Sequence, residues 1–393
     1  METRMNVSDA IFNYEMLVVG RESRGLSQKE LATKLNISAA QLSRIEVGLR
    51  SVKDNELKQN ICDVLKYPIE FFSQSQPVYG IGVSELFHRK RHNISDRLLN
   101  KIYAQIYLRS TELGKLLRSV DFGDINIRPV DINDFDDDAS EVARLTRVSW
   151  KLPHGAIRNL VSDIENAGGI VIPFDFETRN IDAISHWQRG LPPLFFINMF
   201  SPTDRLRFTL CHELGHIVMH RTAEPNSERQ ADEFAAEFLM PAKEIKTELS
   251  DLTLQKLAFL KQYWKVSMAS LIKRATDLQQ ITPRHARTLW MQMGRLGYRT
   301  REPIETDIPA EKPILLRNII ESYTHDMNYS IPELGKLLCL TDAETYNLYI
   351  DNKQLIREKE KKDVIKEALR IIRASQEEKI NHEFENKNEQ NAN

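Results

Sequence analysis

Apolar residues recur every three to four positions along most of the chain, which is the spacing of helices that bury one face. This spacing fills residues 14–72, continues over 94–117 and dominates the chain after residue 241. The strongly apolar segment Gly168–Pro173 lies between these helical stretches. The pattern predicts a mainly α chain with a small α+β domain, an N-terminal helical bundle and a C-terminal helical region.

Two short helices joined by a tight turn are predicted near the amino terminus. Ser27–Glu30 has the form of a capping box, in which a serine and a glutamate three residues later cap the helix start together. Asn36–Ile37 supplies the turn, Ser38–Gln41 is a second capping box, and Gly48 ends the second helix. This arrangement predicts a helix-turn-helix, whose second helix enters the major groove of double-stranded DNA.

Positive charge is concentrated around this motif. Residues 21–53 contain seven lysines and arginines and three acids, whereas residues 1–72 contain ten of each. Such a local excess favours contact with DNA phosphates. The alternative is a helix-turn-helix that only dimerises or docks another protein.

The segment Cys211–His216 contains an H-E-x-x-H motif. His212 and His216 are four residues apart, so on a helix they lie on one face about 6 Å apart along the axis and can bind one metal ion. Glu213 is turned roughly 100° away, toward the place of a metal-bound water. Zinc held in this way keeps an open position and lowers the pKa of its water to about 7. Glu213 would then take the proton and pass it to the leaving amine. The alternative is a chance pair of histidines on a buried helix.

The surroundings of the motif support a helix with a function. Ser201–Asp204 supplies a capping serine, a proline suited to the first turn and an early acid, which mark a helix start. Gly215 lies between the two histidines, where a glycine costs about 1 kcal/mol relative to alanine. We therefore expect a backbone or a substrate to approach closely at this position.

A third metal ligand is expected from a second helix, with Ser227 as its capping residue and Glu228 in its first turn. Glu228 and Asp232 are four residues apart, so both can face the first helix. The carboxylate of Glu228 can complete the coordination, and Asp232 can accept a hydrogen bond from a ligating histidine. Three other acids are rivals for the role of ligand: Glu224, Glu233 and Glu237.

The remaining side chains of the motif are given other roles. His220 lies about 12 Å along the axis from His212, so one ion cannot bind all three histidines, and His220 is interpreted as a helix-end or cleft residue. Cys211 points away from His212 and is interpreted as a buried structural thiol. Two imidazoles and a carboxylate suit Zn²⁺, although Mn²⁺ or iron could occupy the same site.

The runs Arg207–His216 and Glu228–Pro241 resemble the ImmA/IrrE family of metallopeptidases. The resemblance covers roughly residues 95–242. It implies a gluzincin-like core with a short sheet, a base at Glu213 and three metal ligands: His212, His216 and Glu228. Three segments fit that family's sheet: Gly168–Pro173, Ile181–Ser185 and Pro193–Asn198. Members of this family cut helix-turn-helix repressors and thereby derepress stress, mobile-element or defence genes.

The amino-terminal segments Arg21–Gln28 and Leu42–Glu46 resemble the XRE/Cro-type repressor family. The likeness implies that Gln28 touches phosphate or base. It also implies a set of groove-facing residues: Ala39, Ala40, Gln41 and Arg44. Two alanines at the leading positions can contact thymine methyls but cannot form bidentate hydrogen bonds, which limits sequence discrimination. By analogy with this family a homodimer is expected.

Composition adds the cellular setting. The chain has 393 residues, a hydrophobic content of 41% and a net charge of −2, so it can bury several cores and has no global affinity for nucleic acid. Three scattered cysteines do not form a disulfide framework. The amino terminus has no apolar signal core and no run approaches 18 apolar residues, which predicts a cytoplasmic protein without a membrane partner.

The predicted domains follow from these segments. They are a helix-turn-helix domain over 1–72, a linker over 73–94, a peptidase domain over 95–250, helical modules over 251–305 and 306–355, and a charged helix with a polar tail over 356–393. The module around residues 330–349 has acids where a DNA reader has arginines, so it is interpreted as a packing unit.

Three functions compete at this point. The first is a DNA-binding regulator whose zinc endopeptidase domain cuts a protein in trans, such as a helix-turn-helix repressor. The second is a transcription factor with a structural or sensory metal, for which four protein ligands are expected. The third is a fusion that cuts its own linker within residues 73–83.

Overall fold

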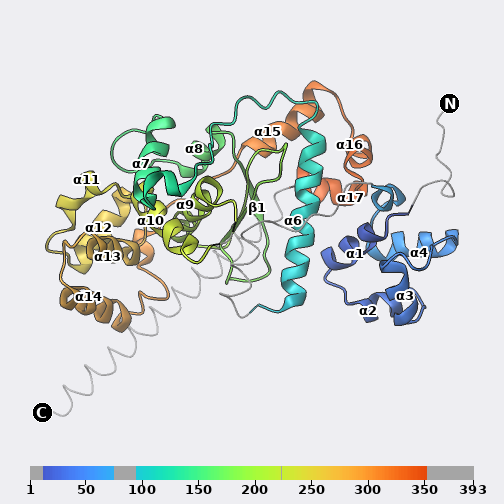
Figure 1. Cartoon of the computed structure of the whole chain (residues 1–393), viewed down its shortest axis with the longest axis horizontal. Helices are drawn as coiled ribbons and strands as arrows, with labels where there is room; N and C mark the ends of the chain where they lie inside the picture. Colours follow the sequence, from blue (N-terminus) through green and yellow to red (C-terminus); the bar gives the residue numbers. More distant parts are fainter. Residues whose placement is uncertain (1–11, 75–93, 223, 352–393) are drawn as a thin grey trace, which may run out of the picture. The chain divides into compact units, whose positions relative to one another are not determined.

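The computed structural model describes residues 12–74, 94–222 and 224–351. It divides into two compact units, Met1–Thr345 and Tyr346–Asn393, and the described part of the second unit is essentially the π-helical turn η6 (Tyr346–Ile350). Helices dominate the described residues and one small sheet accompanies them, which confirms the predicted fold class (Figure 1). Most of the predicted linker, residues 75–93, and the predicted tail lie outside the described residues.

The amino-terminal bundle contains the predicted helix-turn-helix. Its elements are α1 (Tyr14–Ser23), α2 (Gln28–Lys34), α3 (Ala39–Glu46), α4 (Asn55–Leu65) and the 3-10 turn η1 (Ile69–Ser73). The capping box at α2 is complete, because Ser27 accepts from the backbone of Glu30 and the Glu30 side chain accepts from the backbone of Ser27. At α3 the structure gives one half of the predicted box, in which Ser38 accepts from the backbone of Gln41.

A buried ion pair joins α1 to α3. Arg21 Nε lies 2.6 Å from Glu46 Oε1, and the exposed fractions of the two side chains are 10% and 3%. Gln28 Nε2 donates to the other oxygen, Glu46 Oε2, at 2.7 Å. The Glu46 carboxylate therefore holds α1, α2 and α3 together.

Removing this carboxylate is expected to destabilise the bundle strongly. In Glu46→Ala the buried guanidinium of Arg21 loses its closest carboxylate and keeps the longer contact of 3.4 Å to Glu22, and breaking a buried pair costs about 3–5 kcal/mol. Urea unfolding of the full chain, followed by a probe in the amino-terminal bundle, measures the effect. A change below 1 kcal/mol would contradict the assigned role.

The long helix α6 (Asp96–Leu116) packs against α1. Arg97 Nε donates to Gly25 O at 2.6 Å, and Gln105 Nε2 donates to Ser23 O at 3.0 Å. The end of α1 is therefore fixed through its backbone.

Two short carboxyl-terminal helices follow: α16 (Ile331–Leu338), which packs against α6, and α17 (Asp342–Thr345), which contacts the amino-terminal bundle. Arg24 Nη2 lies 2.7 Å from Glu344 Oε2, and the same guanidinium lies 4.0 Å from the centre of the Tyr67 ring. Glu344, one of the acids in the module around residues 330–349, is thus paired with Arg24 of the amino-terminal bundle.

A three-stranded sheet forms the small β part of the chain. Its strands are β1 (Ile170–Phe174), β2 (Ala183–His186) and β3 (Leu194–Asn198), in the order β1-β3-β2. β1 is parallel to β3, β2 is antiparallel to β3, and Phe196 is opposite both Ile172 and Ile184. Helix α9 (Thr203–Met219) packs on β2 and β3. Helix α8 (Leu160–Asn166) precedes the sheet and begins after Asn159, whose side chain caps it.

One hydrophobic core surrounds α9 and α10 (Ser227–Leu239) and includes buried residues from Ile127 to Met293. It is continuous across residue 250, the position where the sequence predicts a domain to end. Other helices that contribute to it include α7 (Ala139–Ser149), α8, α12 (Leu254–Trp264), α13 (Met268–Asp277) and α14 (Pro283–Arg295). The shorter elements of the first unit are η2 (Ile132–Phe135), α11 (Ala242–Ile245), η3 (Lys246–Leu249), η4 (Ile304–Thr306), α15 (Leu315–Glu321) and η5 (Ser322–Asp326). Within the described residues no helix combines the length and apolarity that a membrane crossing needs.

Candidate metal centre

Helix α9 carries the H-E-x-x-H motif and is anchored at its amino-terminal half. Its cap is Pro202 rather than the predicted Ser201, whose hydroxyl instead donates to Asp182. Arg207, which is 2% exposed, donates to Ile157 O at 2.8 Å and pairs with Glu311. The guanidinium therefore fixes the turn of α9 that precedes the first histidine.

The structure brings His212, His216 and Glu228 together, with one potential ligand atom from each lying within 4.8 Å of the others. His212 Nε2 lies 3.0 Å from His216 Nε2, and Glu228 oxygens lie 3.3 Å from His216 Nε2 and 3.8 Å from His212 Nε2. A tetrahedral ion with bonds of 2.0–2.1 Å separates its ligand atoms by about 3.4 Å. The spacing and the donor types therefore fit Zn²⁺. In residues 12–74, 94–222 and 224–351 no other such group of ligands is found.

Asp232 supports the first histidine. His212 Nδ1 lies 2.9 Å from Asp232 Oδ1, and Lys273 Nζ lies 3.1 Å from Asp232 Oδ2. Burial opposes the charge on Asp232, but the hydrogen bond with His212 and the charges of His212 and Lys273 lower its pKa to about 2. Burial likewise opposes protonation of His212, but the hydrogen bond to Asp232 raises its pKa. Asp232 thus holds the Nδ1 proton of His212 and directs Nε2 toward Glu228.

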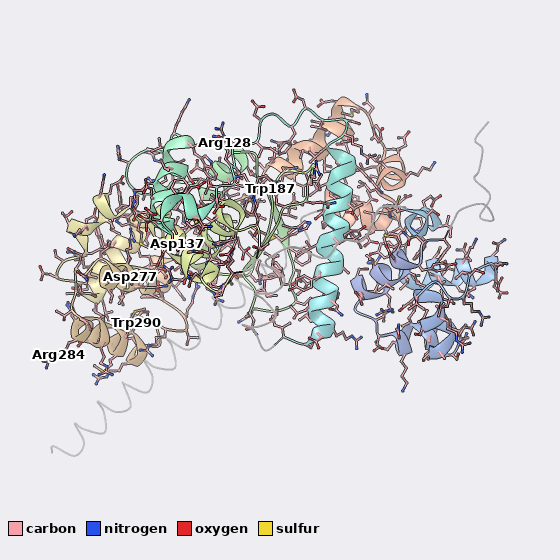
Figure 2. All side chains as sticks on the ribbon, viewed as in Figure 1. Arg128, Asp137, Trp187, Asp277, Arg284 and Trp290 are labelled. Carbon is pink, nitrogen blue, oxygen red and sulfur yellow. The ribbon has the colours of Figure 1, made fainter. Side chains whose placement is uncertain are left out.

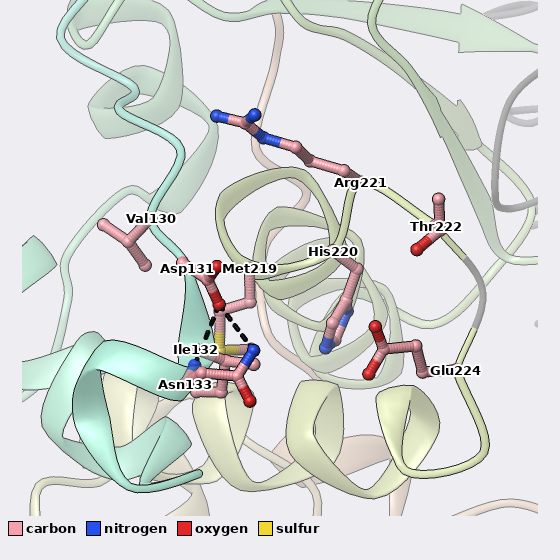
Figure 3. A pocket seen from close by; sticks show the side chains of 9 residues that line it. All are labelled: Val130, Asp131, Ile132, Asn133, Met219, His220, Arg221, Thr222 and Glu224. Carbon is pink, nitrogen blue, oxygen red and sulfur yellow. Dashed lines mark hydrogen bonds between the residues drawn. The ribbon is translucent and has the colours of Figure 1, made fainter.

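His220 ends α9 and contacts the second histidine. Its Nδ1 lies 2.9 Å from His216 Nδ1. Burial and the neighbouring His216 ring lower the pKa of His220 to about 4, so the ring is neutral at physiological pH. His220 also lines a pocket of about 290 Å³ with Asp131, Asn133 and Glu224 among its walls (Figure 3). The predicted helix-end position of His220 agrees with this placement.

Glu213 follows His212 on α9, and its side chain faces the sheet. Its Oε2 accepts from Ser185 N at 2.9 Å and from Ser185 Oγ at 2.6 Å, and the residue is 3% exposed. Strand β2 therefore orients the carboxylate next to His212. Sequence reasoning used Ser185 only as part of a strand and missed this contact.

Gly215 permits the close approach of α10 to α9. A Cβ atom at this position would lie 3.2 Å from Phe234 Cδ1 and 3.3 Å from Ala231 Cα. The expected close neighbour is thus the backbone of the helix that carries Glu228 and Asp232.

The change Gly215→Ala is expected to separate these two helices. Overpacking costs about 1–3 kcal/mol, which exceeds the gain of about 1 kcal/mol in helix propensity. We expect a lower midpoint of thermal unfolding and a weaker affinity for zinc. The control is Gly294→Ala in α14, where the nearest atom to an added Cβ is 3.6 Å away. A stabilised Gly215→Ala protein would contradict the packing argument.

The three rival acids lie elsewhere. Glu233 pairs with Arg229 in an exposed pair of 2.6 Å, and Glu237 is buried against Arg274. Glu224 lines the pocket beside His220.

The cap of α10 is Asn226, so the predicted capping residue Ser227 is instead the first helical residue.

The residues expected to contact DNA are placed on two helices. Ala39, Ala40 and Arg44 are exposed on α3, and Gln41 is half-buried there. Gln28 begins α2 and directs its amide nitrogen to Glu46. The structure therefore shows a structural contact for Gln28.

Comparison with known families agrees with this architecture. Residues 20–72 match the family described as Helix-turn-helix, and residues 165–276 match a peptidase family described as IrrE N-terminal-like domain. A comparison with curated proteins gives no match. The chain is thus a fusion of a helix-turn-helix domain of the XRE type with an IrrE-like domain of the metallopeptidase type, as predicted from the sequence.

Proposed function

We propose that this protein is a cytoplasmic DNA-binding regulator whose IrrE-like domain is a zinc-dependent endopeptidase. Its substrate is a regulatory protein, in the first place a helix-turn-helix repressor of stress, mobile-element or phage-defence genes. The convergence of His212, His216 and Glu228, with Glu213 on the same helix, carries the proposal.

The chain's own residues divide the work of hydrolysis. His212, His216 and Glu228 would hold the zinc, which would supply Lewis-acid activation of water and of the scissile carbonyl near neutral pH. Glu213 takes a proton from the attacking water at its carboxylate and returns it to the leaving nitrogen. Ser185 holds that carboxylate through Oε2, and Asp232 orients His212.

The number of ligands favours catalysis over a structural role. Structural zinc sites have four protein ligands, whereas catalytic sites have three and one open position. Among the described residues the group consists of three side chains, and Glu224, Glu233 and Glu237 are not part of it. This supports a hydrolase over a regulator with a structural metal.

Arg44 is expected to contribute to DNA affinity. It is exposed on α3, the second helix of the motif. If it contacts phosphate, Arg44→Ala lowers the slope of log affinity against log salt by about 1, and if it contacts guanine the loss is about 1–3 kcal/mol at that base pair. Fluorescence anisotropy with DNA from upstream of the chain's own gene measures both. Unchanged binding at every salt concentration would remove Arg44 from the interface.

The central test is metal-dependent cleavage. The purified full chain is incubated with each protein encoded beside its gene, with zinc or with a chelator, and the products are identified by intact mass. We expect one partner to be cut only when zinc is present. Cleavage of the chain itself within residues 73–83 would instead support self-processing, and a zinc-loaded chain that cuts none of the partners would contradict the proposal.

A further inference from the structure

Hydrogen bonds link His216 to a segment outside the group of metal ligands. His216 Nδ1 lies 2.9 Å from His220 Nδ1, and His220 Nε2 lies 2.9 Å from Gln230 Oε1. Gln230 Nε2 in turn donates to Asp137 Oδ1 at 3.3 Å, and Asp137 precedes α7 (Figure 2). The series connects α9, α10 and the residues that lead into α7.

The carboxylate of Asp137, at the end of this series, determines which atom donates in each hydrogen bond. A carboxylate only accepts, so Gln230 turns its amide nitrogen toward Asp137 and its carbonyl oxygen toward His220. That oxygen also only accepts, so the proton of His220 is on Nε2. A neutral imidazole has one N–H, so His220 Nδ1 is an acceptor and the proton between the two rings belongs to His216 Nδ1.

We infer that His220 and Gln230 are positioning residues that hold His216 in the tautomer with a protonated Nδ1. The inference rests on the proposed function, because it concerns how the chain prepares a zinc ligand. The unprotonated atom, His216 Nε2, is the one that lies 3.0 Å from His212 Nε2 and 3.3 Å from Glu228 Oε1. His220 therefore takes part in the site without being a ligand.

The two ligand histidines are supported by different chemistry. A carboxylate, Asp232, contacts His212 directly, and a charged acceptor raises the basicity of its histidine. His216 is contacted by a neutral imidazole that is itself held by a neutral amide. Both rings are thus oriented at Nδ1, His212 by a carboxylate and His216 by the imidazole of His220.

The unmutated protein allows a direct test by nuclear magnetic resonance. In the zinc-loaded full chain with ¹⁵N-labelled histidine, we expect a protonated Nδ1 on His216. We also expect a nitrogen–nitrogen coupling across the hydrogen bond to Nδ1 of His220. A proton on His220 Nδ1, or no coupling between these nitrogens, would overturn the inference.

Two variants test the consequence for metal binding. His220→Phe keeps a ring but removes both nitrogens, and Gln230→Met keeps the length of the side chain but removes the acceptor. Loss of such supporting partners lowers metal affinity by about 10–100-fold. We expect that range for both variants in competition with a chromophoric chelator, with the resonances of His212 retained. Glu233→Gln on the same helix is the control, because Glu233 forms only an exposed pair with Arg229.

The outcomes separate this inference from the proposed function. If the parent chain binds zinc and both variants bind it equally well, the positioning role is wrong and the peptidase proposal stands. If the parent chain binds no zinc, both fall. A variant that loses helical circular dichroism is set aside, and the coupling measured in the parent protein then decides.

Discussion

Peptide hydrolysis is expected to fall by about 10²–10⁴-fold in Glu213→Gln, while zinc and DNA binding stay at the parent level. Glutamine keeps the size of the side chain and can still accept a hydrogen bond from Ser185, but it cannot take a proton from water. The assay compares initial rates of cleavage of a partner that the parent chain cuts, with zinc content determined on the same samples.

The same chemical change at Glu233 is the matched control for this prediction. Glu233 is an acid of α10 that pairs with Arg229 at the surface and is not one of the clustered ligands. Glu233→Gln should cleave at the parent rate. If zinc-loaded Glu213→Gln also cleaves at that rate, another group is the base.

Glu228→Ala is expected to lower zinc affinity by more than about 100-fold, which exceeds the effect of losing a supporting residue. The change removes one of the three clustered side chains that could hold the ion and leaves His212 and His216 as a pair. In the parent chain, zinc at 100 times its dissociation constant should add about 2.7 kcal/mol to the free energy of unfolding. This zinc-dependent stabilisation should disappear in Glu228→Ala.

Thermal unfolding with and without zinc measures the loss, and inductively coupled plasma mass spectrometry measures bound metal. Glu224→Ala is the informative comparison, since Glu224 lies just before α10 and lines the neighbouring pocket, whereas Glu228 is in the first turn of α10. If Glu224→Ala loses zinc and Glu228→Ala retains it, the third ligand has been assigned to the wrong acid.

Local sequence features predicted much of this architecture. Capping boxes, helical spacing and a short apolar run indicate the helix-turn-helix and the sheet, because they depend on residues close together in the chain. The spacing of four between His212 and His216, and between Glu228 and Asp232, predicts common faces for the same reason. The predicted helix caps were one residue off: the caps are Pro202 and Asn226 instead of Ser201 and Ser227. The hydroxyls of the two serines form hydrogen bonds with other residues.

Contacts between distant segments were not predictable in this way. Ser185 is 28 residues from Glu213, and Arg24 pairs with an acid 320 residues away. No periodic pattern connects such positions, so only the packing of β2 on α9 and of α17 near α1 brings them together. The link between His216 and Gln230 was not predicted, because two hydrogen bonds through the His220 ring make it.

The salt bridge between Arg207 and Glu311 limits how the protein can be divided into fragments. The family match ends at residue 276. The guanidinium of Arg207 in α9, however, is paired with Glu311, which lies 35 residues beyond that end. A recombinant fragment that ends at residue 276 would leave the buried guanidinium of Arg207 without its Glu311 carboxylate. Fragments intended for crystallisation or assay therefore need to extend past Glu311.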